Sequence, residues 1–133
     1  MKAVKTKDIG GIGEKLAARY LKKQRCRILA KNCHCGKNEL DLVVKDGDYI
    51  AFVEVKALTF ADPSTAEERR PSTAVDSAKR RRTVEAMRYY LRSHPTKLIP
   101  RFDVVEVYLD RETQKPFRIH HIPDAFGSDG SLH

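Results

Sequence analysis

Apolar residues recur at helical spacing in two segments of the chain. The first runs from about Asp8 to Lys23, and the second from Asp76 or Ser77 to about Ser93, shortly before Pro95. Steps of three and four residues place side chains on one face of an α-helix. The stripe of the first segment is Ile9, Ile12, Leu16, Tyr20 and Leu21, and that of the second is Val75, Ala86, Met87, Tyr90 and Leu91. The pattern therefore predicts two helices that each bury one face.

Five shorter segments, rich in β-branched and aromatic residues, indicate strands. They are Cys26 to His34, Glu39 to Val44, Tyr49 to Ala57, Phe102 to Leu109 and Pro116 to Ile122. Turn residues at Gly36-Lys37-Asn38 and Asp46-Gly47-Asp48 separate the first three, and such short connections favour an antiparallel meander. A helix precedes the last two strands. This order predicts an α/β fold with a mixed sheet flanked by helices.

The segment from Leu58 to Thr73 shows neither the helical nor the strand pattern of apolar residues, and Pro63 and Pro71 exclude a continuous helix there. We expect a long loop, and loops of this length are commonly functional. With 133 residues the chain suits one domain. We expect a single domain over residues 1–126 and a disordered tail over residues 127–133.

The charge balance changes the picture from a generic α/β domain to one that attracts polyanions. Lys and Arg number 26 against 18 Asp and Glu, a net charge of +8, which favours nucleic acid as a partner, although a basic surface can also serve solubility alone. No apolar run approaches the ~20 residues of a membrane-spanning helix. Met1 to Asp8 lack the apolar stretch of a secretory signal. We expect a cytoplasmic protein without a membrane partner.

Strand alternation gathers charged residues on one face of the expected meander. Glu39 and Asp41 share a side of their strand, as do Glu54 and Lys56 of theirs, because successive side chains in a strand point to opposite faces. In the strand from Glu39 to Val44, the alternation places Leu40, Leu42 and Val44 on the opposite side from Glu39 and Asp41.

Pairing through the Asp46-Gly47-Asp48 turn would bring Asp41 and Glu54 to about 5 Å, where two negative charges repel by about 3 kcal/mol at an effective dielectric constant of 20. Lys56 can offset part of this repulsion. A divalent ion with oxygen ligands, Mg²⁺ or Mn²⁺, would use every group present. The alternative is a solvated sheet face with cross-strand salt bridges.

The two expected helices add charged residues that could face this sheet. Glu14 lies at the edge of the first apolar stripe, and the alternative for it is an exposed acid of the first turns. Lys79 falls within the second stripe, so its ammonium should reach an anionic group. Arg80, Arg81 and Arg82 follow it and are typical of a phosphate-attracting surface.

The cysteines allow a different kind of site. Three cysteines cannot all pair, so reduced thiols are expected. Cys33 and Cys35, with His120 and His121, could form a zinc site. Their Cys-x-Cys spacing is shorter than that of the usual zinc motifs, which argues against zinc.

Several motifs together resemble a known family. Glu39-Leu40-Asp41-Leu42 followed by Phe52-Val53-Glu54-Val55-Lys56 is similar to the D-x(n)-E-x-K core of the PD-(D/E)xK nuclease superfamily. The wider pattern resembles the YraN-like bacterial family, in which Leu58 here replaces a residue that is often basic. The segments that carry this resemblance are Gly13-Glu14 with Ala17 and Tyr20-Leu21, the Asn32 region, Lys79 with Tyr90-Leu91, Arg101 to Val105, and His121-Ile122 with Ala125-Phe126.

The resemblance implies a restriction-endonuclease-like mixed sheet, similar to archaeal Holliday-junction resolvases, and a set of site residues. The implied catalytic residues are Glu14, Asp41, Glu54 and Lys56. The implied metal ligands are Asp41, Glu54, the Val55 carbonyl and Glu39, and the expected nucleic-acid contacts are Lys79, Arg80, Arg82, Arg69 and Arg70. Mg²⁺, or Mn²⁺, would be the cofactor.

The expected function is therefore metal-dependent hydrolysis of phosphodiester bonds in DNA, at branched or otherwise structured sites. A nuclease-fold protein that binds nucleic acid without cutting it is the alternative. A homodimer would suit a two-stranded substrate.

Overall fold

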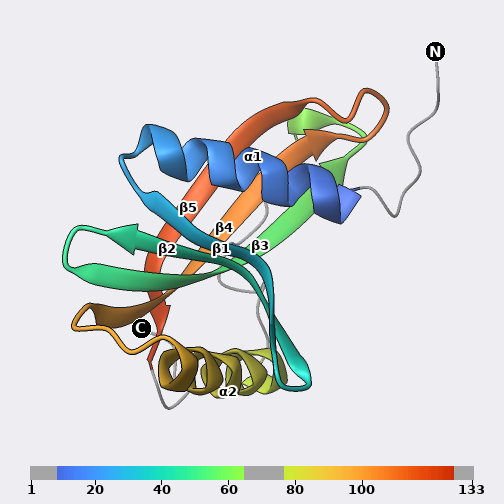
Figure 1. The fold of residues 1–133 in the computed structure, drawn as a ribbon. Helices are drawn as coiled ribbons and strands as arrows, with labels where there is room; N and C mark the ends of the chain where they lie inside the picture. The colour runs from blue at the N-terminus through green and yellow to red at the C-terminus, as the bar shows by residue number, and fades with distance from the viewer. Residues whose placement is uncertain (1–8, 65–76, 128–133) are drawn as a thin grey trace.

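The computed structural model describes residues 9–64 and 77–127 and shows a five-stranded sheet with one helix on each face (Figure 1). The elements are α1 (Ile9–Lys23), β1 (Arg27–Cys35), β2 (Asn38–Asp46), β3 (Tyr49–Phe60), α2 (Ser77–Ser93), β4 (Ile99–Asp110) and β5 (Pro116–Phe126). The expected α/β class is confirmed, and the arrangement is compatible with a restriction-endonuclease-like fold. Apart from Gly127, the expected disordered tail lies outside the described residues.

The strands lie in the order β1-β2-β3-β4-β5. β1, β2 and β3 form the antiparallel meander that the short turns predicted, and β4 and β5 are also antiparallel. β3 and β4 pair in parallel over the full length of both, from Tyr49↔Ile99 to Phe60↔Asp110. The chain between them includes α2, as a crossover connection between parallel strands requires. The sheet is therefore mixed.

Each face of the sheet has its own core, because each face is covered by a helix. Ala17, Ala18 and Leu21 of α1 pack against Val53 and Val105. On the opposite face the buried side of α2 packs against β2, β3 and β4, with Val84, Ala86, Met87 and Tyr90 against Phe52 and Phe102. Strands that are buried on both faces read as nearly continuous apolar runs, as β3 and β4 do.

Four strands, β2, β3, β4 and β5, are longer than the sequence pattern predicted. The expected loop began at Leu58, but Leu58, Thr59 and Phe60 continue β3 because β4 supplies backbone partners for all three. Leu58 and Phe60 form a small apolar cluster with Tyr108. β4 also begins three residues earlier than expected, and β5 continues to Phe126. The remainder of the expected loop from residue 65 lies outside the described residues.

Among the glycines of the described residues, Gly13 lies closest to a neighbouring element: at this position α1 approaches β3. A Cβ atom built on Gly13 would lie 2.8 Å from the Cβ of Ala57 in β3. By contrast, nothing lies within 4 Å of a Cβ built on Gly10 or Gly11. The absence of a side chain at Gly13 therefore sets the distance between the helix and the strand.

This contact predicts opposite effects of one substitution at two glycines of the same helix. Gly13→Ala should lower the free energy of unfolding by about 1 to 3 kcal/mol, because overpacking displaces backbone. Gly10→Ala should raise it by up to about 1 kcal/mol, because alanine favours the helix. Urea unfolding of both variants measures the difference. Equal effects would show that the α1–β3 contact adapts to a methyl group.

A buried ionic network joins β4 to β5 and to the end of β2. The Asp103 carboxylate accepts hydrogen bonds from Arg101 Nε at 2.8 Å, from Arg101 Nη2 at 2.9 Å and from the Asp124 amide at 3.0 Å. His121 Nε2 lies 2.7 Å from the same carboxylate, and Arg101 also donates to Asp46 at 2.9 Å. Burial opposes ionisation of Asp103, but these partners together hold its pKa below the usual range.

Candidate metal-binding site

The candidate site lies where β2 separates from β3. Backbone pairing between these strands runs from Asp46↔Tyr49 to Leu42↔Val53 and does not continue to Asp41 and Glu54. β2 itself continues past this point along β1 as far as Asn38. Two adjacent carboxyl groups therefore lie beside a gap in the sheet instead of within a regular ladder.

The departure of β2 corrects one expectation from strand alternation. Leu42 and Val44 pack in the core under α1, as expected, but Leu40 packs with Val43 in the core under α2. The expected common face of Leu40, Leu42 and Val44 is therefore wrong. Strict alternation fails because β2 changes its course at Asp41, the residue between the two cores.

Asp41 and Glu54 come together at this gap, and their carboxyl groups are hydrogen-bonded to each other. The amide of Val55 donates to Asp41 Oδ2 at 2.9 Å, which fixes the orientation of that carboxyl group. Burial, followed by the charge of Asp41, raises the pKa of Glu54 to about 7, and burial also raises the pKa of Asp41. Full ionisation of the pair therefore needs a compensating cation.

Lys79 supplies a cation to this pair from α2. Its ammonium forms an ion pair with Glu54 Oε1, so the prediction that Lys79 reaches an anionic group is confirmed. Glu54 is buried, whereas 42% of the Lys79 side chain is exposed. Desolvation alone would lower the pKa of Lys79, but the hydrogen bond and charge of Glu54 and the charge of Asp41 raise it.

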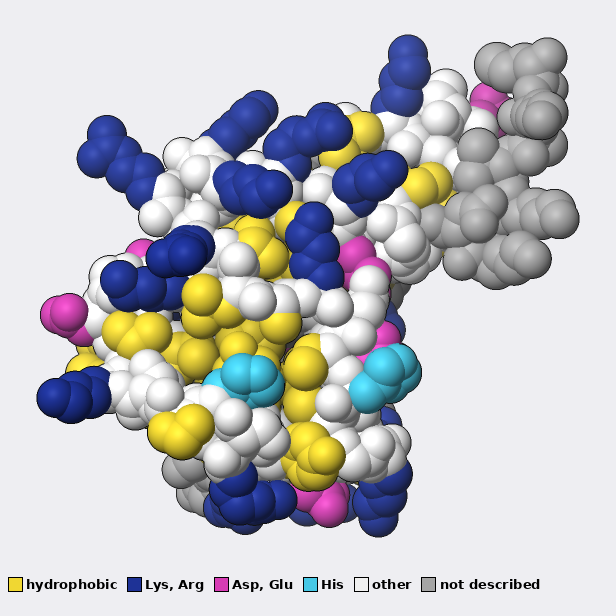
Figure 2. All heavy atoms as spheres, in the orientation of Figure 1, with side chains coloured by type: hydrophobic (Ala, Val, Ile, Leu, Met, Phe, Trp, Pro, Cys, Tyr) yellow, Lys and Arg dark blue, Asp and Glu magenta, His cyan; other side chains and the backbone are white. Residues whose placement is uncertain are grey.

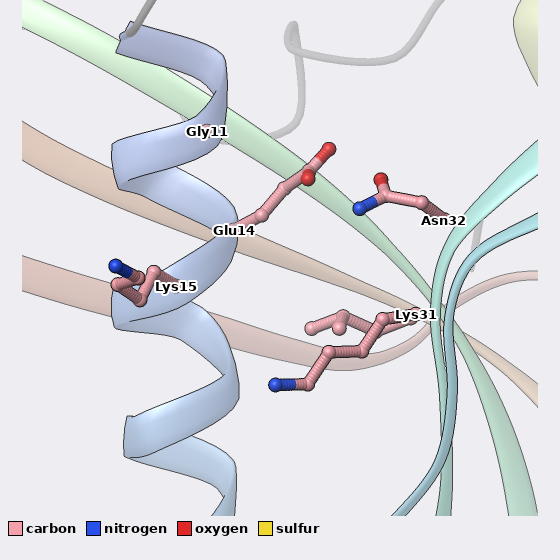
Figure 3. Close-up of a pocket in the computed structure, with 6 residues that line it drawn as sticks. Gly11, Glu14, Lys15, Lys31 and Asn32 are labelled. Carbon is pink, nitrogen blue, oxygen red and sulfur yellow. The ribbon is translucent and has the colours of Figure 1, made fainter.

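Glu14 approaches the pair from α1, so it faces the sheet and is not an exposed acid. Figure 3 shows Glu14 extending from α1 toward Asn32 of β1, across a cavity of about 240 Å³. Burial, followed by the charge of Asp41, raises the pKa of Glu14, and a hydrogen bond with Asn32 opposes this rise. Lys15 and Lys31 line the same cavity.

Asn32 is a site residue to which the sequence pattern assigned no role. It lies between the register pairs Lys31↔Leu42 and Cys33↔Leu40, and its φ of 47° is in the left-handed region. Asparagine tolerates this conformation better than most residues, and unusual backbone conformations gather at functional sites. An asparagine within an otherwise regular strand was the signal available in the sequence.

Lys56 lies on β3 two residues after Glu54 and is half-buried. It takes part in no ion pair among the residues that the structure describes. Its register partner on β4 is Glu106, which is 1% exposed, accepts a hydrogen bond from the Tyr108 hydroxyl at 3.2 Å and lies 3.5 Å from His120. Glu106 is a second residue without an assigned role, recognisable as an acid within an apolar strand.

The remaining expected site residues are distributed around the gap. Glu39 and Arg82 line a second cavity of about 200 Å³ together with Lys37, Asn38, Glu54, Lys79 and Thr83. Arg82 is exposed and Arg80 half-buried on α2. Arg69 and Arg70 lie outside the described residues. The two cavities flank the pair of carboxyl groups, one on the side of α1 and one on the side of α2.

The donor set fits a divalent ion of the magnesium type. No group of three or more His, Cys, Asp or Glu side chains that could hold one ion occurs within residues 9–64 and 77–127. Mg²⁺ does not need such a group, because it keeps several water ligands and binds proteins through one or two carboxylates. Asp41, which is half-buried, and Glu54, which is buried, lie side by side and repel when both are charged, so they meet that requirement.

The zinc alternative is not supported by the positions of its residues. Cys33 and Cys35 have their sulfur atoms 3.8 Å apart and pack in the core under α2. His120 contacts Glu106 and His121 contacts Asp103, so the histidines serve other groups. All three cysteines are free thiols.

Comparisons with known proteins give a consistent result. A family model described as uncharacterised protein family UPF0102 matches residues 13–107, which include Glu14, Asp41, Glu54, Lys56 and Lys79. A UPF0102 protein of Caldanaerobacter subterraneus is 40% identical over 95% of this chain and 100% of its own length. One of Pelotomaculum thermopropionicum is 42% identical over 90% of this chain and 96% of its own length. Separately, no helix within the described residues is both long and apolar enough to cross a membrane.

Proposed function

The chain belongs to UPF0102, an uncharacterised protein family, and from the geometry of its site we propose that it is a metal-dependent nuclease of the PD-(D/E)xK type that hydrolyses phosphodiester bonds in DNA. The observation that carries the proposal is the hydrogen-bonded pair Asp41–Glu54 beside a gap between β2 and β3, with Lys56 two residues along the same strand. This arrangement reproduces in space the order of the D-x(n)-E-x-K motif.

Each residue around the gap would have a separate role in the proposed hydrolysis. Asp41 and Glu54, with the Val55 carbonyl, would hold Mg²⁺ or Mn²⁺, which supplies Lewis acidity and neutralises charge on a phosphate. The Val55 amide holds Asp41 in orientation. Lys56, which is in no ion pair among the described residues, would orient the attacking water and stabilise developing negative charge. Glu14, aligned by Asn32, would accept a proton from a water molecule or assist the metal.

The distribution of positive charge supports a polyanionic substrate. Figure 2 shows Lys and Arg side chains gathered on the side of the molecule where α1 lies, and Lys15, Arg19, Lys22 and Lys23 are exposed on that helix. Lys31 on one side of the acidic pair and Arg82 on the other line the two flanking cavities. Cations on both sides of the site would bind phosphates on either side of the one that reacts.

A specific observation also favours the second candidate, a protein that binds nucleic acid without cutting it. Lys79 already neutralises part of the acidic pair, so the site can hold its charge without a metal. Such a protein would use the same basic surface and would need no catalytic ion.

The test is a cleavage assay of the full chain on linear, flapped and four-way DNA, with Mg²⁺, with Mn²⁺ and with a chelator. A nuclease gives products only with metal and loses them in the Lys56→Met variant, in which the alkyl chain is retained without charge. A salt-sensitive gel shift without products on every substrate would overturn the nuclease proposal and support the binding protein.

A further inference from the structure

The Lys79 ammonium occupies the position beside Glu54 that a bound metal ion would need. Its ammonium contacts Glu54 Oε1, and Glu54 is hydrogen-bonded to Asp41. An ammonium and a divalent ion cannot both contact the same carboxylate oxygen without strong repulsion. Under the proposed function, metal binding at Glu54 therefore requires that Lys79 leave this oxygen.

The structure offers Lys79 a place to go. Its side chain is 42% exposed and lines the cavity of about 200 Å³ on the α2 side of the site. Arg82 and Lys37 line the same cavity, together with the acids Glu39 and Glu54. Its three cations outnumber its two acids, so a phosphate would bind there favourably. Thr83 donates a hydrogen bond to the Lys79 carbonyl at 2.9 Å within α2. The backbone is thus anchored, and the side chain alone has to move.

We propose that Lys79 and the divalent ion are alternative cations at Glu54, and that a nucleic-acid phosphate in the neighbouring cavity draws the Lys79 ammonium away, so that metal and DNA bind cooperatively. Without DNA, Lys79 competes with the metal and keeps the acidic pair neutralised. With DNA, the phosphate provides the ammonium with another anionic partner. By linkage, the metal then strengthens DNA binding by the same factor as DNA strengthens metal binding.

This proposal, which rests on the proposed function, names Lys79 as a positioning residue whose loss should improve metal binding in the absence of DNA. Lys79→Met keeps an apolar side chain of similar length and removes the charge. Its control is Arg82→Met, which removes a cation from the same cavity but not from Glu54. All variants are made in a Lys56→Met background, so that DNA is not cleaved during the titration.

Mn²⁺ binding is measured by electron paramagnetic resonance of the full chain, with and without a short DNA duplex. Without duplex, Lys79→Met should bind Mn²⁺ at least fivefold more tightly than its parent, which is the lower end of typical coupling between sites. Arg82→Met should leave that affinity within about twofold, because it changes no contact to Glu54. Duplex should strengthen Mn²⁺ binding several-fold more in the parent than in Lys79→Met.

The outcomes separate the two proposals. Loss of Mn²⁺ binding in Asp41→Asn establishes that the ion binds at the proposed site. If Lys79→Met then binds Mn²⁺ without duplex no more tightly than its parent, the exchange of cations is overturned and the nuclease proposal stands. If Mn²⁺ does not bind at Asp41 in any variant, the proposed function fails and the exchange fails with it. A circular dichroism spectrum identical to that of the parent establishes that Lys79→Met retains its helices.

Discussion

Asp41→Asn should abolish Mg²⁺-dependent cleavage and at the same time make the metal-free protein more stable. Activity is lost because the amide removes one of the two negative charges that would hold the ion. Stability rises because burial, together with the charge of Glu39, makes ionised Asp41 costly in the fold, as its raised pKa indicates. Asparagine keeps an oxygen that can accept the hydrogen bond of the Val55 amide. The substitution therefore removes the charge with little change in shape.

The gain in stability should be about 1 kcal/mol, or roughly 4 °C in Tm for a domain of this size. It is smaller than the about 3 kcal/mol of direct repulsion expected for two charges at 5 Å, because Lys79 already offsets part of it. Thermal unfolding in chelator and cleavage in Mg²⁺ are measured on the same preparations. Glu85→Gln on the exposed side of α2 is the charge-matched control and should change neither. An Asp41→Asn variant that is less stable without metal and still cuts DNA would mean that the site is wrongly assigned.

Asp103→Asn should be among the most destabilising single substitutions, with a loss of about 3 to 5 kcal/mol in the free energy of unfolding. Its carboxylate is 0% exposed and accepts hydrogen bonds from Arg101 and from the Asp124 amide, while His121 contacts it at 2.7 Å. Removing the charge leaves the Arg101 guanidinium, whose side chain is only 11% exposed, without its buried partner. Urea unfolding at neutral pH measures the loss.

The matched control is Asp46→Asn, which removes the other carboxylate bound by the same guanidinium. The Asp46 side chain is 41% exposed, so water compensates for its loss and the cost should be at most about 1 kcal/mol. A cost at Asp46 equal to that at Asp103 would show that burial does not decide the strength of this network.

The effect of Asp103 should also depend on pH in a defined direction. Its pKa is lower in the fold than the ordinary value of 3.8, so its contribution to stability is complete above about pH 4 to 5 and is lost as the pH falls through the lower, folded value. The difference in the free energy of unfolding between the wild-type protein and Asp103→Asn should therefore become smaller below pH 3.8. A constant difference down to pH 2 would contradict the assignment.

The sequence predicted the elements well where the signal is local. Both helices end at the predicted residue, Lys23 and Ser93, because apolar periodicity and a nearby proline depend only on neighbouring residues. The meander followed from short turns. The strand ends were less well predicted: Leu58 to Phe60 became strand because β4 offers them partners, and no property of those three residues reveals a partner about fifty positions away.

By itself, the sequence determined that Glu54 and Lys56 share one side of a strand and that Asp41 lies within reach of them across a tight turn, because alternation and turn length are properties of the local backbone. Only the tertiary structure decided the rest. The course of β2 moves Leu40 to the other core. Asn32, in a left-handed conformation, hydrogen-bonds Glu14, and packing of α2 selects Glu54 as the partner of Lys79. Each of these contacts depends on where a separate helix or strand packs against the sheet. That position is set by the burial of both sheet faces, which involves the whole chain and not a local segment.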